Sequence, residues 1–159
     1  KRQAECALAQ CYPNLNWAAV RAPYVVGKND YTQRLAFYVE NAIKQIPMKI
    51  TTPDSKISFI HEDEAGNFLS YLVDHPCQGP YNASSKGWIS VQEILNYVQE
   101  KTGIVPILSD EGILAPYDGS KDFSVIVDKA EKNGFEFSTL NSWFYQLLDH
   151  YIEIYKNNG

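Results

Sequence analysis

Residues 57–74 read ISFIHEDEAGNFLSYLVD, and this stretch decides the fold class. It opens at 57–60 with branched and aromatic residues, which are typical of a short buried strand. Acidic residues follow, and apolar residues then recur at helical spacing: Phe68, Leu69, Leu72 and Val73. We therefore expect a strand that leads directly into a helix, which is capped by Asp63 and ends near Asp74.

Further helices are predicted on both sides of this segment. An apolar stripe at 32–46 predicts a helix that Asp30 or Thr32 can cap. Ser90 and Glu93 have the spacing of a capping box, in which each side chain satisfies a free backbone donor of the other. The helix that they open should end near Gly103, because glycine favours the left-handed conformation of a helix end.

Short strands are expected between the helices, at 17–21, 81–83 and 104–108, while Pro23 and Gly27 indicate a loop. This alternation of strands and helices is typical of an α/β fold.

The last part of the chain contains two regions with different patterns. The sequence at 110–133 has the least regular pattern, and the sequence from Ser138 onward has the most regular one. Glycine and proline make 110–121 resemble a loop, and 122–133 is expected to form a helix that Gly134 ends. From Ser138 onward, apolar residues follow helical spacing for more than four turns. We expect this final stripe to belong to the core.

Composition excludes several classes of protein. The 159 residues are 45% hydrophobic and 13% aromatic, so the chain can bury a core and disorder is not expected. A net charge of −5 without a basic cluster argues against nucleic acid and acidic membranes as partners. No apolar run approaches the roughly 20 residues that span a bilayer.

The cysteines and the start of the chain also carry information. Three cysteines without a C-x-x-C pair favour reduced thiols in a cytoplasmic protein over disulfides or a zinc site. The chain opens without an apolar signal segment and within an uncapped helical pattern, at Ala4, Ala7, Leu8 and Cys11. We therefore expect a fragment of a longer protein.

Residues that could carry chemistry are few. There is no dinucleotide-binding glycine motif, no phosphate-binding loop and no nucleophile motif. The polar cluster at 61–64 is either half of a metal site or simply a helix start, in which acidic side chains complement the helix dipole; the second interpretation is favoured. Arg21 closes an apolar strand, so it forms either a structural ion pair or part of a ligand site.

Three segments from the first part of the chain resemble motifs of one known family, the extended short-chain dehydrogenases, also called the NAD(P)-dependent epimerase/dehydratase family. KRQAE at 1–5 is similar to the K-R-x-A-E that begins with the lysine of the Y-x-x-x-K motif. VRAPYVVG at 20–27 resembles L-R-P-x-x-V-Y-G, with the proline displaced by one position. FIHEDE at 59–64 resembles F-I-H-V-D-D, with Glu62 in place of Val and Glu64 in place of the second Asp.

Two later segments extend the resemblance to about residue 102. GPYNA at 79–83 is similar to the family's G-x-x-Y-N-V strand, and SVQEI at 90–94 is similar to the helix start that follows it. The resemblance implies an α/β fold in which residues 1–30 form the edge of a Rossmann-type sheet. Residues 31–159 would form a carboxy-terminal, mixed α/β substrate-binding lobe.

The family resemblance assigns a catalytic role to Lys1. It would hold the nicotinamide ribose of NAD or NADP and lower the pKa of a tyrosine that moves the proton. That tyrosine and the cofactor's glycine motif would both lie upstream of this chain. The fragment alone is therefore expected to be inactive and to bind no cofactor.

The resemblance also implies binding residues. Arg21, Pro23 and Tyr24 would lie beside the cofactor, and Tyr24, together with Arg34 and His61, would contact the substrate. The parent protein would act by hydride transfer on a small molecule. The surface exposed by the absence of the other half could also form an oligomer.

One departure from the family bears on the substrate. Members that act on nucleotide sugars usually place an arginine two residues before the Phe of F-I-H, and that position here is Ile57. Lys56 would face the opposite side of the strand, which leaves Arg34 as the other nearby candidate. We therefore expect a small hydroxy or carbonyl substrate in preference to a nucleotide sugar.

Two other interpretations stay open at this point. The protein could be a non-catalytic member of the same family that binds the cofactor as a sensor or scaffold. It could instead be an autonomous domain that binds a small ligand, in which case its fold should be closed and fully capped.

Overall fold

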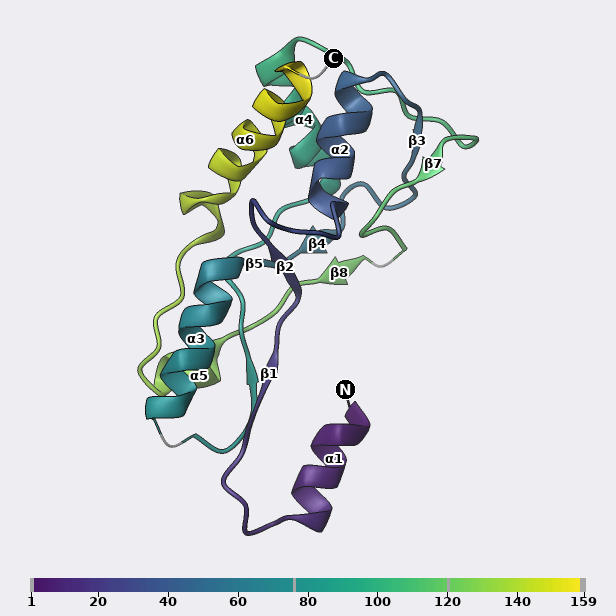
Figure 1. Cartoon of the computed structure of the whole chain (residues 1–159). Helices are drawn as coiled ribbons and strands as arrows, with labels where there is room; N and C mark the ends of the chain where they lie inside the picture. The colour runs from purple at the N-terminus through teal and green to yellow at the C-terminus, as the bar shows by residue number, and fades with distance from the viewer. Residues whose placement is uncertain (1, 76, 120, 158–159) are drawn as a thin grey trace.

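A computed structural model describes residues 2–75, 77–119 and 121–157, and these form a mixed α/β fold (Figure 1). The α-helices are α1 (Arg2–Cys11), α2 (Arg34–Ile43), α3 (Glu62–Asp74), α4 (Val91–Thr102), α5 (Asp128–Lys132) and α6 (Phe144–Asn157), and a short 3-10 helix covers Leu140–Ser142. The strands are β1 (Ala18–Arg21), β2 (Tyr24–Val26), β3 (Met48–Lys49), β4 (Lys56–Ile57), β5 (Phe59–His61), β6 (Gly79–Asn82), β7 (Ile113–Leu114) and β8 (Asp122–Phe123).

The strands form four two-stranded sheets, and every pair is parallel. The pairs are β1 with β6, β2 with β5, β3 with β7, and β4 with β8. Parallel strands need a crossover connection, and these connections carry the helices. The expected α/β class with parallel strands is therefore confirmed, whereas a continuous Rossmann-type sheet is not formed within the described residues.

The larger core lies among α2, α4 and α6, which pack together at one end of the molecule (Figure 1). Its fully buried side chains include Leu35, Val39, Ile94, Phe144 and Leu148. The stripes predicted for these helices are thus confirmed as core.

A smaller core forms around α3. Phe68 packs its ring against Phe135 and Phe137, with centroids 4.8 and 5.1 Å apart. Tyr81 of β6 and Ala130 of α5 complete this cluster. The short helix α5 and the strand β6 therefore pack against the same hydrophobic cluster beside α3.

Helix starts differ from the expectations in three places and agree in one. Helix α4 has the predicted capping box between Ser90 and Glu93, and Gly103 ends it with a φ of 74°. The cap of α3 is His61, whose Nδ1 accepts the N–H of Asp63 at 3.2 Å, so the expected cap by Asp63 is wrong. His61 directly precedes the first helical residue, Glu62, so its imidazole lies beside the free amide of Asp63.

Helix α2 is also capped differently from the expectation. It starts at Arg34 after Gln33, which has a φ of 53° and no side-chain capping bond. Asp30 Oδ1 instead accepts the N–H and the hydroxyl of Thr32, at 2.9 and 2.7 Å, within the preceding turn. Ser138, the expected cap of the last helix, does not cap it, because α6 begins at Phe144 and the 3-10 helix before it has Thr139 at its N-cap. The N–H of Ser138 donates to Glu64 Oε1 at 2.6 Å.

Three predictions of secondary structure are wrong. The segment predicted as a loop at 22–27 contains β2, whose three residues are too few to give a pattern between Pro23 and Gly27. Residues 104–108 form no strand, and only Leu108 makes an isolated bridge, to Met48. The helix expected at 122–133 is divided into β8 and the shorter α5.

The amino-terminal segment contributes little to either core. None of residues 3–25 is buried. Arg21 holds this segment together, because its guanidinium binds both carboxylate oxygens of Glu5, with Nε at 3.1 and 3.0 Å. Within the described residues, no helix has the length and apolar character needed to cross a membrane.

Candidate functional site

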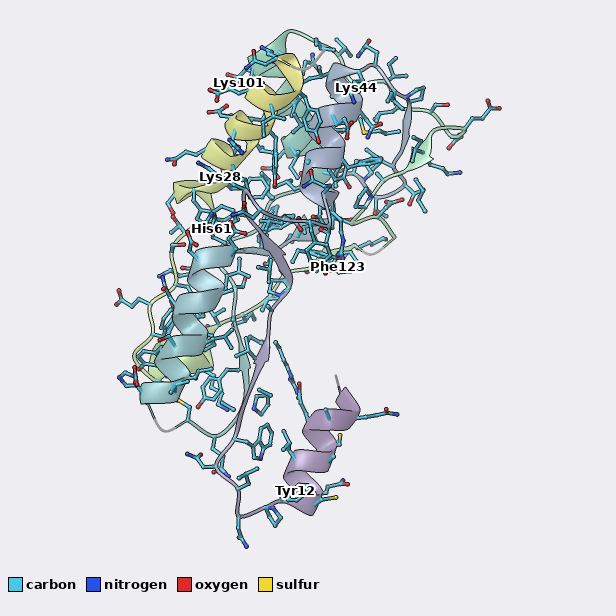
Figure 2. The ribbon with its side chains drawn as sticks, in the orientation of Figure 1. Tyr12, Lys28, Lys44, His61, Lys101 and Phe123 are labelled. Carbon is cyan, nitrogen blue, oxygen red and sulfur yellow. The ribbon has the colours of Figure 1, made fainter. Side chains whose placement is uncertain are left out.

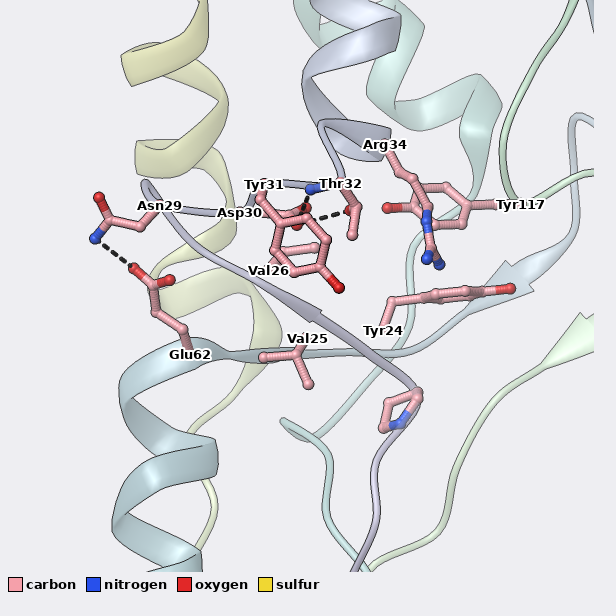
Figure 3. A pocket seen from close by; sticks show the side chains of 11 residues that line it. Tyr24, Val25, Val26, Asn29, Asp30, Tyr31, Thr32, Arg34, Glu62 and Tyr117 are labelled. Carbon is pink, nitrogen blue, oxygen red and sulfur yellow. Dashed lines mark hydrogen bonds between the residues drawn. The ribbon is translucent and has the colours of Figure 1, made fainter. Parts of the chain in front are cut away.

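A cavity of about 450 Å³ lies where β2, the following loop and the start of α2 meet (Figure 3). Three of the residues predicted from the sequence line it together: Pro23, Tyr24 and Arg34. The other lining residues come from β2, from the loop that follows it, from α3 and from the loop before β8: Val25, Val26, Asn29, Asp30, Tyr31, Thr32, Glu62 and Tyr117.

The loop between β2 and α2 is held in place by its own polar groups. Asp30 is 8% exposed, and one of its carboxylate oxygens binds Thr32 as described above. Below the loop, the Tyr151 hydroxyl of α6 donates to the carbonyl of Gly27 at 2.7 Å. Burial, with Asp30 and Glu62 nearby, raises the pKa of Tyr151 to about 12, so this hydroxyl stays a donor at neutral pH.

One end of the cavity is aromatic and carries the arginine. The guanidinium carbon of Arg34 lies 5.9 Å from the ring centroid of Tyr24, which is within the range of a cation–π contact. Tyr117 packs on Tyr24 with the ring centroids 4.4 Å apart. Burial raises the pKa of Tyr117 far above its usual value, and nearby Tyr38 and Asp30 act in the same direction. Tyr117 is therefore a neutral hydroxyl.

Arg34 is free to bind a ligand. Within the described residues its guanidinium makes no ion pair, and its electrostatic partners are the ring of Tyr24 and the hydroxyl group of Tyr117. A guanidinium presents several N–H donors in a plane, and these match the oxygens of a carboxylate or phosphate. This end of the cavity is suited to an anionic group.

The other end of the cavity is acidic. Figure 3 shows Glu62 and Asn29 opposite the group formed by Arg34, Tyr24 and Tyr117. Asn29 Nδ2 lies 3.5 Å from Glu62 Oε1, at the limit of a hydrogen bond. The Glu62 side chain lies against Gly27. A Cβ atom added at Gly27 would overlap the carboxyl group of Glu62.

The cluster at 61–64 does not converge on one point. Glu62 faces the cavity, Asp63 is 84% exposed, and Glu64 accepts from the Ser85 hydroxyl at 2.6 Å and from a backbone amide. No group of three His, Cys, Asp or Glu side chains in the described part of the chain is arranged to hold a metal ion. The positions of these residues agree with the interpretation as a helix start.

His61 lies outside the cavity, at the beginning of α3 (Figure 2). Its ring contacts the edge of Trp143, with the centroids 5.2 Å apart, and both line a separate shallow hollow with Glu136. The structure therefore does not bring His61 together with Tyr24 and Arg34.

The two remaining predicted residues are at the amino-terminal end. Arg21 is paired with Glu5 beside an apolar cleft of about 620 Å³ between α1 and β1, which Leu8 and Val20 also line. That pairing lowers the pKa of Glu5 and raises the pKa of Arg21. Lys1 lies outside the described residues.

Among the lining residues that sequence reasoning did not assign to the site are Asn29, Asp30, Glu62 and Tyr117. Glu62 had a usable signal, because it stands where the resembling motif has Val. Tyr117 had none, since it reaches the cavity from a distant loop that carries no recognisable motif.

Comparison with known proteins gives a match in fold alone. No family model matches the sequence. No curated protein sequence matches it either. The structure, in contrast, is similar to solved structures of NAD-dependent epimerases and dehydratases.

Three of these matches show the extent of the similarity. UDP-glucose 4-epimerase of Thermus thermophilus, in complex with NAD, matches with a TM-score of 0.70 at 16% identity, over 94% of this chain and 50% of that chain. UDP-glucose 4-epimerase of Thermotoga maritima, with UDP-glucose, matches with a TM-score of 0.75 at 14% identity, over 99% and 52%. The dTDP-glucose 4,6-dehydratase of Bacillus anthracis, in complex with NAD, matches with a TM-score of 0.72 at 14% identity, over 99% and 49%.

The chain thus spans about half the length of the solved chains that it matches. The fold of the family that the five sequence segments resemble is thus found in the structure. At these identities the similarity establishes the shared fold, and activity must be argued from the site.

Proposed function

We propose that this chain is the substrate-binding half of a nicotinamide-dependent epimerase, dehydratase or reductase that acts on a small hydroxy or carbonyl compound. The observation that carries the proposal is the meeting of Pro23, Tyr24 and Arg34 on one cavity. Pro23 and Tyr24 belong to a segment that resembles a family motif, and the fold matches about half the length of solved epimerase and dehydratase chains.

The location of the cavity supports a substrate site. It lies across the proposed boundary at residue 30, with β2 on one side and α2 and α3 on the other. Small-molecule sites occur preferentially where two structural units meet. The cavity therefore stands where a cofactor held by one half could meet a substrate held by the other.

Three residues are assigned to the substrate. Arg34 would bind an anionic or strongly polar group, and the Tyr24 ring would hold both the guanidinium and the carbon skeleton of the ligand. Tyr117, kept neutral by burial, would donate or accept one hydrogen bond. Arg21 is occupied by Glu5 and His61 lies elsewhere, so neither is part of this assignment.

The cofactor itself does not fit this chain alone. A pyrophosphate is usually held by a glycine-rich turn at the start of a helix that follows a parallel strand. Here β5 runs directly into α3, but the first turn of α3 contains Glu62, Asp63 and Glu64, which would repel phosphate. NAD or NADP would therefore be bound by another part of the protein. The proposed role of Lys1 is limited to holding the nicotinamide ribose of that cofactor.

The test uses the full-length protein with NAD or NADP and a panel of hydroxy and carbonyl compounds. Product formation is followed by NMR, which detects epimerisation and dehydration, and net oxidation or reduction of the nicotinamide is followed for a reductase. The proposal expects turnover of at least one compound and a loss of roughly tenfold or more in kcat/KM for Arg34→Met. Lys56→Met is the matched control, because Lys56 lies over Trp88 and away from the cavity. Ligand binding without any turnover would instead favour a non-catalytic function.

A further inference from the structure

The cavity that we assign to the substrate contains more negative than positive side chains. Asp30 and Glu62 carry carboxyl groups, and Arg34 is the one cationic residue among the described residues that line it. Counted formally, two negative charges stand against one positive charge. A site for a ligand with several negative charges usually has more positive than negative side chains.

The two carboxyl groups are not consumed by internal ion pairs. Asp30 Oδ2 is buried and has no hydrogen-bond partner within the described residues, while the other oxygen binds Thr32. In the part of the chain that the structure describes, the Glu62 carboxyl group makes one marginal hydrogen bond, with Asn29, and no ion pair. Both carboxyl groups therefore leave acceptor capacity and negative potential beside the cavity.

The charges are also separated in space. Arg34 stands with Tyr24 at one end of the cavity, and Glu62 stands at the other (Figure 3). A ligand that fills the cavity lengthwise would place one end at a cation and the other end at an anion. Complementarity then demands an anionic group at one end and hydrogen-bond donors at the other.

We infer that the cavity selects a small organic ligand with a single anionic group for Arg34 and hydroxyl or ammonium donors for Glu62, and that it rejects nucleoside diphosphates. This inference rests on the proposed function, because it assumes that the cavity is the substrate site. Rejection follows from Glu62 and Asp30, since a diphosphate would bring further negative charge against two carboxyl groups. Glu62 is the residue that determines specificity.

The experiment measures binding of four probes to the full-length protein by calorimetry. Caproate has one carboxylate and no donor, ε-aminocaproate adds an ammonium group, gluconate adds hydroxyl groups, and uridine diphosphate supplies several negative charges. We expect ε-aminocaproate, gluconate or both to bind at least about tenfold more tightly than caproate and than uridine diphosphate. The two donor probes distinguish an ammonium ligand from a hydroxyl ligand.

Two variants test Glu62 without relying on one substitution. Glu62→Gln removes its charge, and Gly27→Ala displaces the unchanged carboxyl group, because the added Cβ overlaps it. Both should reduce the preference for the donor probes at least about fivefold, and Glu62→Gln should strengthen binding of uridine diphosphate. Asp63→Asn is the matched control, because Asp63 is adjacent, carries the same charge and is 84% exposed outside the cavity.

The outcomes separate this inference from the proposed function. If Arg34→Met weakens every probe but neither Glu62→Gln nor Gly27→Ala changes the preference, the cavity binds ligands and the inference is wrong. Tighter binding of uridine diphosphate than of all three carboxylates in the wild-type protein would also overturn it. If no probe binds, or if Arg34→Met changes nothing, the cavity is not the ligand site and both proposals fail.

Discussion

The guanidinium of Arg34 lies over the ring of Tyr24, with 5.9 Å between the guanidinium carbon and the ring centroid. One residue belongs to β2 and the other to the first turn of α2, and the loop between them is fixed through Asp30 and Gly27. The pairing holds a cation ready at one end of the cavity without neutralising it.

The ring of Tyr24 should therefore matter for binding of an anion. Tyr24→Leu is expected to weaken binding of the tighter of the two donor probes, gluconate and ε-aminocaproate, about two- to fivefold, since an exposed cation–π contact contributes about 0.5–1 kcal/mol. Tyr24→Phe keeps the ring and should bind as the wild-type protein does. Calorimetric titration of both variants checks this, and an equal loss in the two would show that the hydroxyl, and not the ring, is what matters.

Asp118 should stabilise the fold in a pH-dependent way. Its carboxylate accepts the amides and hydroxyls of Thr51 and Thr52, at 2.6 to 3.1 Å, and so joins two distant loops. Burial opposes ionisation of this carboxyl group, but the hydrogen bonds from Thr52 and Thr51 outweigh it and lower the pKa of Asp118 to about 2. Because the folded state has the lower pKa, this stabilisation is complete above the unfolded value of about 4 and is lost as the pH falls toward about 2.

Asp118→Asn tests that linkage. At neutral pH it should lower the free energy of unfolding by about 1–2 kcal/mol, and the difference from the wild-type protein should shrink as the pH falls from about 4 to about 2. Urea denaturation at a series of pH values gives the comparison. A difference that stays constant over this range would contradict the assigned pKa.

The capping box of α4 gives a test of local stability. Ser90 Oγ accepts the N–H of Glu93 at 3.1 Å, and Glu93 Oε2 accepts the N–H of Ser90 at 2.8 Å. Ser90→Ala should cost about 1 kcal/mol of unfolding free energy, because one helix amide loses its acceptor and α4 lies in the main core. Ser90→Thr restores the oxygen and should recover most of the loss in a thermal melt.

This box also shows what the sequence could predict. Ser90, Glu93 and Gly103 act through their immediate neighbours along the chain, so their spacing alone was sufficient to predict α4. The cap of α3 was missed because the helix begins at Glu62, which places His61 at the N-cap position and Asp63 inside the first turn, and spacing does not decide which residue comes first. The strand predicted at 104–108 is wrong because only its end pairs with Met48, and branched residues favour a strand only where cross-strand neighbours are present along it.

The candidate site was predictable only in part for a similar reason. Tyr24 lies in a segment that resembles a family motif, so a local resemblance located it. Arg34, ten residues later, lies outside the matched segments and was predicted only as a nearby cation. Tyr117 and Glu62 are brought to the cavity by tertiary packing. The hydrogen bond from Tyr151 to Gly27 also depends on tertiary packing. Pairing between distant segments leaves no trace in local spacing.

The chain by itself should not bind the cofactor. Calorimetry with NAD and with NADP is expected to give no binding at micromolar concentrations, because the acidic first turn of α3 repels the pyrophosphate. Replacing Glu62, Asp63 and Glu64 with their amides removes the repulsion but supplies no glycine-rich turn, so it should not create a site. Micromolar affinity of residues 1–159 for either cofactor would contradict the assignment of cofactor binding to another part of the protein.

The central claim is that the cavity at Tyr24 and Arg34 binds the substrate of a nicotinamide-dependent reaction. The most direct measurement is turnover by the full-length protein across small hydroxy and carbonyl compounds and UDP-, GDP- and dTDP-sugars, for the wild-type protein, Arg34→Met and Lys56→Met. We predict turnover of a small hydroxy or carbonyl compound that falls roughly tenfold or more in Arg34→Met and is unchanged in Lys56→Met. Turnover of a small compound that is unaffected by Arg34→Met would contradict the claim, and turnover of a nucleotide sugar that collapses in Arg34→Met would contradict the assigned substrate class.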